Sequence, residues 1–170
     1  MGTRKKTKDQ GGLALMSPLG PIEAYALEHR RFHPDVQAIL APFFAPLGLA
    51  WRDVRVKVRT AQFGSLGIRG RPTAVGVFGS TIHCIPGVLD ADSVIRGNTW
   101  SWTQPRGVAL WAHEVYHVYQ WRRWRLRFVA SVVWGVLRSL MRGRFYDHQV
   151  IGIEVEATAF QRQVLAILHR

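Results

Sequence analysis

Apolar residues follow a helical spacing in the last third of the chain. Residues 107–124 contain no Gly or Pro after the first position and are apolar almost all round, which predicts a buried helix that begins near Pro105. A last helix is predicted over 153–168, because apolar residues recur there at i, i+4, i+7 and i+11. Its expected buried stripe comprises Ile153, Ala157, Phe160, Val164, Ile167 and Leu168.

An alternating pattern predicts strands in the middle of the chain. Between residues 51 and 60 valines alternate with Arg55, Lys57 and Arg59, as in a half-buried strand with a cationic outer face. Residues 74–78 and 81–85 predict two short strands joined around Gly79-Ser80. An edge strand can bind an extended peptide by main-chain pairing, and the strand over 81–85 is our candidate for this role.

The first part of the chain predicts a basic leader and two helices. Residues 1–12 form a cationic leader that we expect to be disordered, and residues 13–170 are expected to form a single domain. The apolar run over 13–16 is too short for a signal peptide, so we expect a cytoplasmic protein or one exported without a cleavable signal. Residues 22–44 predict helix up to Pro42, with Pro34 starting a second helix. That proline argues against a His29/His33 site on one helix.

The string His113-Glu114-Val115-Tyr116-His117 is an H-E-x-x-H motif inside the predicted buried helix. Histidines four apart on a helix project from the same face and can share one zinc ion, and the intervening glutamate can reach an activated water. Buried histidines and a buried glutamate need partners, which a metal ion provides. The alternative is that both histidines are hydrogen-bonded core residues and the glutamate is a surface charge. The motif favours a metal-dependent hydrolase.

A hydrolytic zinc site needs a third protein ligand and an open fourth position. The candidates are Glu154 and Glu156, which open the last predicted helix. They flank its apolar stripe on opposite sides, so periodicity does not choose between them. Without a metal, both would be carboxylates favoured by the positive end of the helix dipole.

The segment 112–120, Ala-His-Glu-Val-Tyr-His-Val-Tyr-Gln, followed later by Ile-Glu-Val-Glu-Ala at 153–157, resembles a group of small bacterial gluzincin-like domains. These have an A-H-E-(L/V)-x-H-V-x-Q helix and a later E-x-E-A helix, and are best known from cargo proteins of extracellular contractile injection systems. Residues 74–87 are similar to the family's hairpin, which ends in G-x-x-I-x-x-x-P-G. The resemblance covers residues 47–168.

The resemblance implies one zinc ion held by His113, His117 and Glu154, with Glu114 as general base. Related gluzincins place a small residue three positions after the third ligand and a short polar residue four after it. Glu154 fits this rule through Ala157 and Thr158, and Glu156 fits it less well. The second position is often Asp or Asn in such families, able to orient a histidine ligand, so Thr158 is a weak substitute.

Three further residues carry candidate chemistry. Tyr146 and His148 lie in a polar stretch between the two last helices and are candidates for stabilising the oxyanion or contacting substrate; the alternative is that they are loop or capping groups. The lone cysteine, Cys84, excludes an internal disulfide and is expected to be a small core residue. His83 is expected to be an ordinary strand residue.

The net charge of +12 raises the question of an anionic partner, with seven arginines between residues 122 and 144. Apolar residues in that interval form a stripe comprising Val129, Val132, Val133, Val136, Leu137 and Leu140. The uncharged stretch 128–137 is too short to span a bilayer. The pattern favours a helix packed on the core with a solvated basic face over a helix lying on an anionic membrane. Nucleic acid is a third candidate partner, without a recognition motif.

These observations predict an α+β, zincin-like fold in which a small sheet or hairpin packs on the active-site helix and a C-terminal helix supplies the last ligand. The predicted function is a zinc metallopeptidase of gluzincin type acting on a peptide or protein substrate. The alternative is a catalytically weak zinc-stabilised binding module for nucleic acid or a membrane surface. The intact general base favours the peptidase, since a structural zinc site has no use for Glu114.

Overall fold

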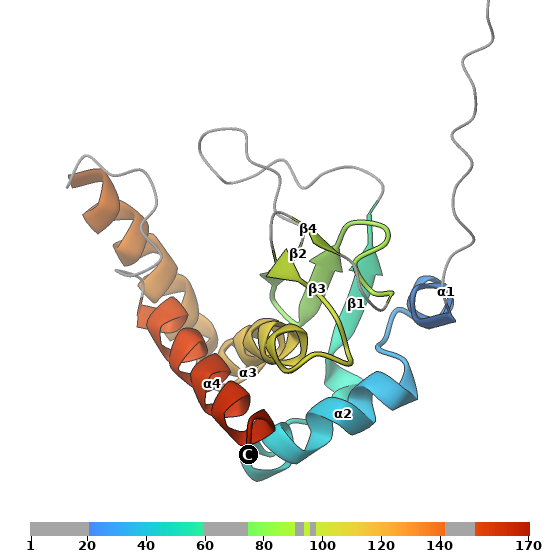
Figure 1. Ribbon diagram of the computed structural model, residues 1–170. Coiled ribbons are helices and arrows are strands. Elements are labelled where there is room, and N and C mark those ends of the chain that lie inside the picture. Colours follow the sequence, from blue (N-terminus) through green and yellow to red (C-terminus); the bar gives the residue numbers. More distant parts are fainter. Residues whose placement is uncertain (1–20, 60–74, 91–93, 96–97, 142–151) are drawn as a thin grey trace, which may run out of the picture.

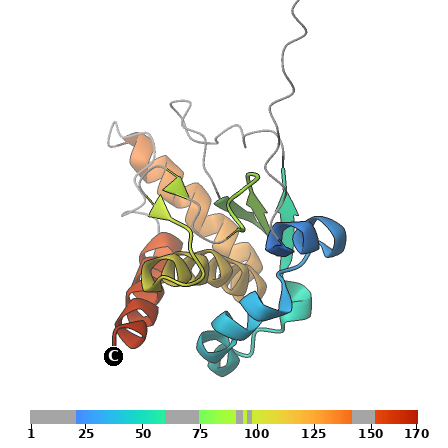
Figure 2. The same ribbon diagram turned by 45° about the vertical axis from the view of Figure 1, so that its right-hand side comes forward.

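The protein is an α+β structure in which helices dominate, as the sequence predicts at this level (Figures 1 and 2). The computed structural model describes residues 21–59, 75–90, 94–95, 98–141 and 152–170. The helices are α1 (Pro21–His29), α2 (Pro34–Phe44), α3 (Pro105–Met141) and α4 (Gly152–Leu168). The strands are β1 (Arg55–Val58), β2 (Val75–Phe78), β3 (Thr81–Cys84), β4 (Val94–Ile95) and β5 (Asn98–Thr99).

Three strands form a sheet with the order β1-β3-β2. β2 and β3 are the predicted antiparallel hairpin, and Gly79 at its turn has a φ of 65°, which favours glycine. β1 pairs in parallel with the other side of β3. The expectation that the second hairpin arm is an edge strand is therefore wrong, because both edges of β3 are already hydrogen-bonded within the sheet.

The first strand is shorter than the alternation predicts. Trp51–Asp53 forms a 3-10 turn, and β1 begins only at Arg55. The alternation itself is confirmed, since Val54 and Val56 are buried and the side chains of the intervening basic residues are exposed. An ion pair joins this turn to α3, with Nη2 of Arg122 2.9 Å from Oδ2 of Asp53.

The two N-terminal helices separate where Pro34 predicts. α1 ends at His29, and His33 caps α2 by accepting a hydrogen bond from the Asp35 backbone N–H at 3.3 Å. The prediction that helix stops at Pro42 is wrong, because α2 continues to Phe44 with the proline inside it.

The core is built around Trp111, which is fully buried in the first half of α3. Its ring contacts Phe32, Trp100 and Trp102, with the last ring stacked at a centroid distance of 4.7 Å. Trp102 also donates a hydrogen bond to the Leu89 carbonyl oxygen at 2.8 Å. Aromatic burial therefore fixes the helix that carries the H-E-x-x-H motif against the loops before and after the sheet.

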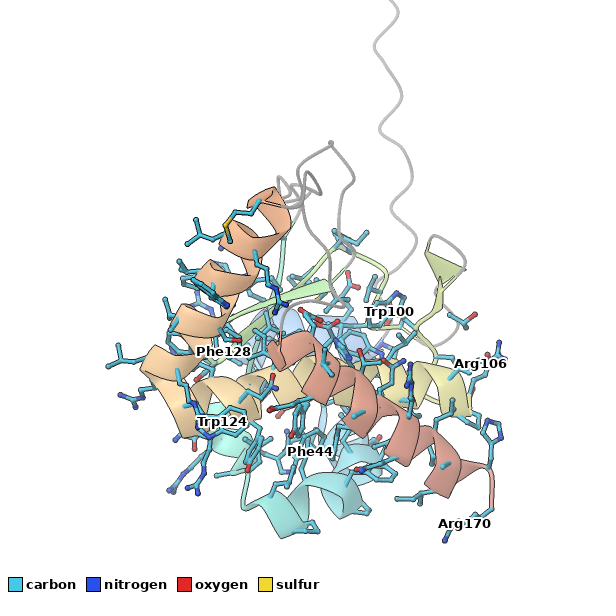
Figure 3. The ribbon with its side chains drawn as sticks, turned by 90° about the vertical axis from the view of Figure 1, so that its left-hand side faces the viewer. Phe44, Trp100, Arg106, Trp124, Phe128 and Arg170 are labelled. Atoms are coloured by element: carbon cyan, nitrogen blue, oxygen red, sulfur yellow. The ribbon has the colours of Figure 1, made fainter. Side chains whose placement is uncertain are left out.

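α3 bends at Arg125, whose backbone is not helical (φ 15°, ψ −83°). Figure 3 shows the helix running from Arg106 to the bend near Trp124 and then turning in a new direction past Phe128. The first half lies in the core, as the sequence predicts.

The expectation that the second half packs its apolar residues on the core is wrong for three of the six, whereas Val132 is partly buried and the side chains of Val136 and Leu140 lie outside the described part. Val129, Val133 and Leu137 are each about half exposed, at 45%, 51% and 47%. This half faces the body with another surface, where Gly135 is buried and Ser131 approaches Gly152 of α4. The small residues allow a close approach that the longer apolar side chains would prevent. Among the described residues, no helix combines the length and hydropathy needed to cross a membrane.

α4 packs much as its periodicity predicts. Ile153, Ala157 and Val164 are buried, whereas Ile167, expected in the same stripe, is exposed near the end of the helix. Phe160 stacks on Tyr116 of α3 with a centroid distance of 4.5 Å. The same ring contacts Phe44 of α2, so α4 is held against two helices at once.

We predict that Gly107→Ala destabilises the fold. A Cβ atom at this position would overlap the backbone of Ser101, which is fully buried. Relieving that overlap requires a backbone shift at the start of the zinc-motif helix, which costs about 1–3 kcal/mol. Urea denaturation measures the change. Gly152→Ala is the control, since its Cβ would meet only the Ser131 hydroxyl at 3.6 Å. Equal stability of the two variants would contradict this packing.

Candidate metal centre

Two histidines of α3 and one glutamate of α4 bring their ligand atoms to one point. The Nε2 atoms of His113 and His117 lie 3.1 Å apart. Oε2 of Glu154 lies 3.4 Å from the first and 3.5 Å from the second. The spacing of four residues gives the histidines a common face, and the first turn of α4 places the carboxylate opposite them.

The triangle of ligand atoms has the size of a zinc site. With zinc–ligand distances of about 2.1 Å and tetrahedral angles, two ligand atoms stand about 3.4 Å apart. The three separations of 3.1, 3.4 and 3.5 Å scatter around that value. The donor set, two imidazole nitrogens and one carboxylate oxygen, is also one that zinc accepts. The residues present therefore fit the metal.

The three side chains are largely removed from solvent. The exposed fractions of the His113, His117 and Glu154 side chains are 14%, 8% and 16%. A carboxylate and two imidazoles in such a place need a compensating positive charge, which is either a proton shared with histidine or a metal ion.

The surroundings of His117 change its pKa. Burial by itself lowers the pKa of His117, but the Glu154 carboxylate raises it as a hydrogen-bond acceptor and as a charge, and Glu114 and Gln120 add to the rise. The net result is a pKa above the ordinary value of 6.5. The imidazole therefore retains a proton to higher pH than a free histidine does, and a metal ion that bound at Nε2 would have to displace that proton.

Gln120 forms a hydrogen bond with the side of the His117 ring that faces away from the cluster. The Oε1 atom of this fully buried glutamine lies 2.9 Å from His117 Nδ1, the ring nitrogen that faces away from the cluster. Its Nε2 atom donates to the Ile153 carbonyl oxygen at 3.0 Å and to Oε2 of Glu156 at 3.1 Å. An acceptor at Nδ1 places the ring proton there and leaves Nε2 free for a metal.

The structure thus separates the two candidate carboxylates. Glu154 joins the histidines, whereas Glu156 joins the glutamine that orients one of them. Nδ1 of His113 is buried without a hydrogen-bond partner among the described residues. Thr158 therefore does not orient this histidine by a hydrogen bond to Nδ1. Gln120 is the last residue of the motif at 112–120, but the sequence pattern assigned it no role. Its position three after His117, on the same helix face, was a usable signal.

Glu114 follows His113 on α3 and is partly exposed. Its negative charge is one of the contributions that raise the pKa of His117. Because this charge acts on His117 and the side chain is partly exposed, Glu114 is a candidate for proton transfer. Tyr146 and His148, the candidates for a second electrophile, lie outside the described residues.

His83 and Cys84 are buried in β3, and neither joins the cluster of ligand atoms. Burial and the charges of Arg59 and Lys57 lower the pKa of His83. Burial and the charge of Glu23 raise the pKa of the Cys84 thiol to about 12. The thiol is therefore protonated at neutral pH, as expected of a core cysteine.

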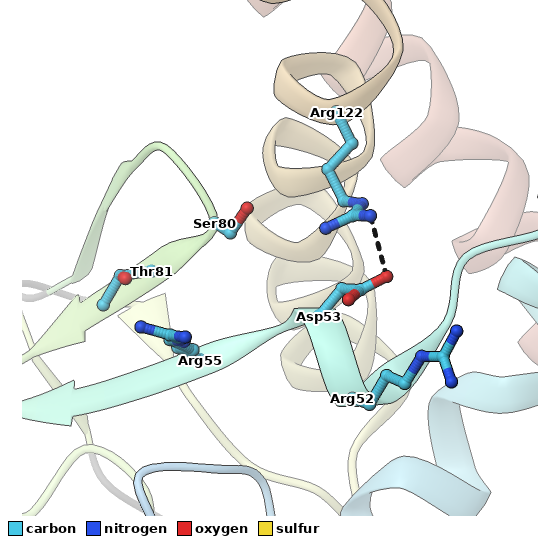
Figure 4. A pocket seen from close by; sticks show the side chains of 6 residues that line it. All are labelled: Arg52, Asp53, Arg55, Ser80, Thr81 and Arg122. Carbon is cyan, nitrogen blue, oxygen red and sulfur yellow. Dashed lines mark ion pairs between the residues drawn. The ribbon is translucent and has the colours of Figure 1, made fainter.

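Two hollows elsewhere are not part of the centre. One of about 330 Å³ is lined by Arg52, Asp53, Arg55, Ser80, Thr81 and Arg122, with the ion pair to Asp53 across it (Figure 4). The other, of about 160 Å³, lies between α4 and the bend of α3 and includes Glu156. Neither contains a ligand residue of the cluster.

Comparison with known proteins adds no identification. No protein-family model matches the chain, and neither the curated proteins nor the solved structures contain a match. The centre is therefore described by its own geometry.

We predict that zinc uptake distinguishes the two carboxylates. Glu154→Ala removes an atom of the triangle and should abolish stoichiometric zinc, as should His113→Ala. Glu156→Ala removes only a partner of Gln120 and should retain zinc with weakened affinity. Elemental analysis of purified, dialysed protein measures the content. Loss of zinc from Glu156→Ala with retention in Glu154→Ala would reverse the assignment.

Gln120→Leu should weaken zinc binding about 10- to 100-fold by removing the acceptor at His117 Nδ1. Competition against a chromophoric chelator gives the affinity. Gln163→Leu, at an exposed position of α4, is the control and should bind zinc like the unaltered protein. An affinity unchanged in Gln120→Leu would show that the glutamine is only a packing residue.

Proposed function

We propose that this protein is a zinc-dependent metallopeptidase of gluzincin type. The observation that carries the proposal is the triangle of His113, His117 and Glu154, with ligand atoms 3.1–3.5 Å apart, next to a glutamate that is not itself a ligand. The likeness of the two helix motifs to gluzincin-like domains supports the same activity and a zincin-like arrangement.

The proposed roles follow from position. Zinc, when bound, supplies a Lewis acid and lowers the pKa of water toward neutrality. Glu114 accepts a proton from the attacking water and delivers it to the leaving amine, which a partly exposed carboxylate beside the cluster can do. Gln120 keeps His117 in the tautomer and orientation that the site needs.

The composition of the site favours catalysis over a purely structural metal. Structural zinc is usually enclosed by four protein ligands, often including cysteine. Among the described residues, three candidate ligands meet here, and the chain's one cysteine is buried in β3 outside this cluster. Three protein ligands leave a coordination position for water.

The sheet offers a different substrate strand from the one that the sequence suggests. β3 is central, so the outer edge of β2 (Val75–Phe78) takes its place as the proposed site of main-chain pairing with an extended peptide. β2 packs against α3, and the adjoining turn at Gly79 lies against Trp121, one turn beyond His117. A peptide on this edge would lie on the same side of the fold as the zinc-motif helix.

The test is cleavage of a complex peptide library by zinc-loaded protein, followed by mass spectrometry. Glu114→Gln should retain zinc and lose activity by at least about 100-fold, because it removes the proton acceptor and leaves all three ligands. Chelation should abolish cleavage and added zinc should restore it. Glu28→Gln, an exposed glutamate on α1, is the control and should cleave normally.

Stoichiometric zinc without cleavage of any peptide would contradict the proposal and favour the zinc-stabilised binding module. Equal cleavage by Glu114→Gln would show that another group is the base.

A further inference from the structure

The second half of α3, from Leu126 to Met141, exposes an unusual amount of apolar surface. Leu126 is 86% exposed, Trp134 62% and Met141 73%. Isolated exposed apolar residues are ordinary, but a contiguous row on one element marks an interaction surface. The row, called here the apolar stripe, comprises Leu126, Val129, Val133, Trp134, Leu137 and Met141.

The stripe is a single face of a helix. Apart from the adjacent pair Val133 and Trp134, its members are spaced by three and four residues, so they lie within one sector along about 22 Å of helix. The opposite sector faces the body, where Gly135 is buried and Phe128 contacts the rings of His117 and Trp121. The stripe is therefore the side turned away from the rest of the described fold. In Figure 1 this half of α3, in orange, extends away from the sheet and from α2.

Cations border the stripe, and acidic residues are missing from the neighbouring sequence. Arg127 and Arg138 are exposed and fall beside Trp134 on the helix surface. The sequence from residue 115 to residue 146 contains no Asp or Glu. An apolar face with a cationic border is the pattern of a helix that lies in the interface of a membrane.

We propose that this helix docks on an anionic lipid bilayer, with its axis in the membrane plane. The apolar stripe would enter the boundary between headgroups and acyl chains. Trp134 would lie at the level of the headgroups, where tryptophan is enriched, and the arginines would contact lipid phosphates. The proposed mode is peripheral, because the apolar residues occupy one face of the helix and arginines border it. This inference is independent of the proposed peptidase activity.

Charge decides against a second copy of the chain as the occupant. Each copy has a net charge of +12, and pairing two apolar stripes would bring the arginines of both copies together without an acidic partner from this segment. An anionic bilayer supplies the opposite charge and the apolar phase in one surface.

The test uses the full chain with vesicles of phosphatidylcholine alone and of phosphatidylcholine with phosphatidylglycerol, separated by sedimentation. The protein should bind the anionic vesicles preferentially, and the double variant Leu126→Ser, Trp134→Ser should partition about tenfold more weakly. Arg127→Ser with Arg138→Ser should weaken binding by a similar factor and reduce its dependence on salt. Because all four side chains are exposed, these variants are expected to fold normally, and circular dichroism verifies this.

Ile167→Ser is the control, since it removes an exposed apolar residue from α4 outside the stripe. It should bind vesicles like the unaltered protein. Three results would overturn the proposal: no preference for anionic vesicles, equal losses in the control and the stripe variants, or a dimer in ultracentrifugation that only the stripe variants abolish. Binding to duplex DNA that competes with vesicles and ignores the stripe variants would instead indicate nucleic acid.

Discussion

The burial of two imidazoles and a carboxylate against one another is the constraint on which this structure depends. Oε2 of Glu154 stands within 3.5 Å of two histidine nitrogens in a place where little solvent reaches. Without a positive charge, such a carboxylate would cost several kcal/mol of desolvation. A shared proton meets that need in part, and this is why the pKa of His117 is raised. A divalent cation meets it more completely, since it engages all three groups at once.

The apolar scaffold keeps this arrangement in place. Phe160 lies between Tyr116 and Phe44, which fixes the rotation of α4 about its axis and so the direction of Glu154. The hydrogen bond from Gln120 to the Ile153 carbonyl oxygen fixes the first turn of α4 against α3 at a second point. Because the ligands stand on packed helices, the proposed site needs little reorganisation when a metal enters.

Local patterns in the sequence predict the elements that carry the chemistry. The motif at residues 113–117 and the alternation in β1 depend only on neighbouring positions, and the structure has the expected helix and strand. The choice between Glu154 and Glu156 depends on how α4 rotates against α3, which periodicity along α4 alone does not contain. Likewise β3 is central because distant β1 pairs with it, and no local pattern in the hairpin records that partner.

The bend in α3 is another feature that the local sequence does not predict. Neither Gly nor Pro, the residues at which helices often bend, lies near Arg125. The bend turns the second half of the helix so that small residues meet α4 and the apolar stripe faces outward. A pattern of apolar residues predicts an amphipathic helix, but it does not predict whether the apolar face packs on the protein core or lies on the surface.

The coordination of zinc in the loaded protein tests the account most directly. X-ray absorption at the zinc edge should give four nitrogen or oxygen neighbours at about 2.0–2.2 Å, with the outer-shell scattering of two imidazoles and no sulfur. One neighbour should be exchangeable, so that a small anionic inhibitor alters the spectrum. A zinc ion with one histidine or none, or one enclosed by four protein ligands that no inhibitor displaces, would contradict the proposed catalytic centre.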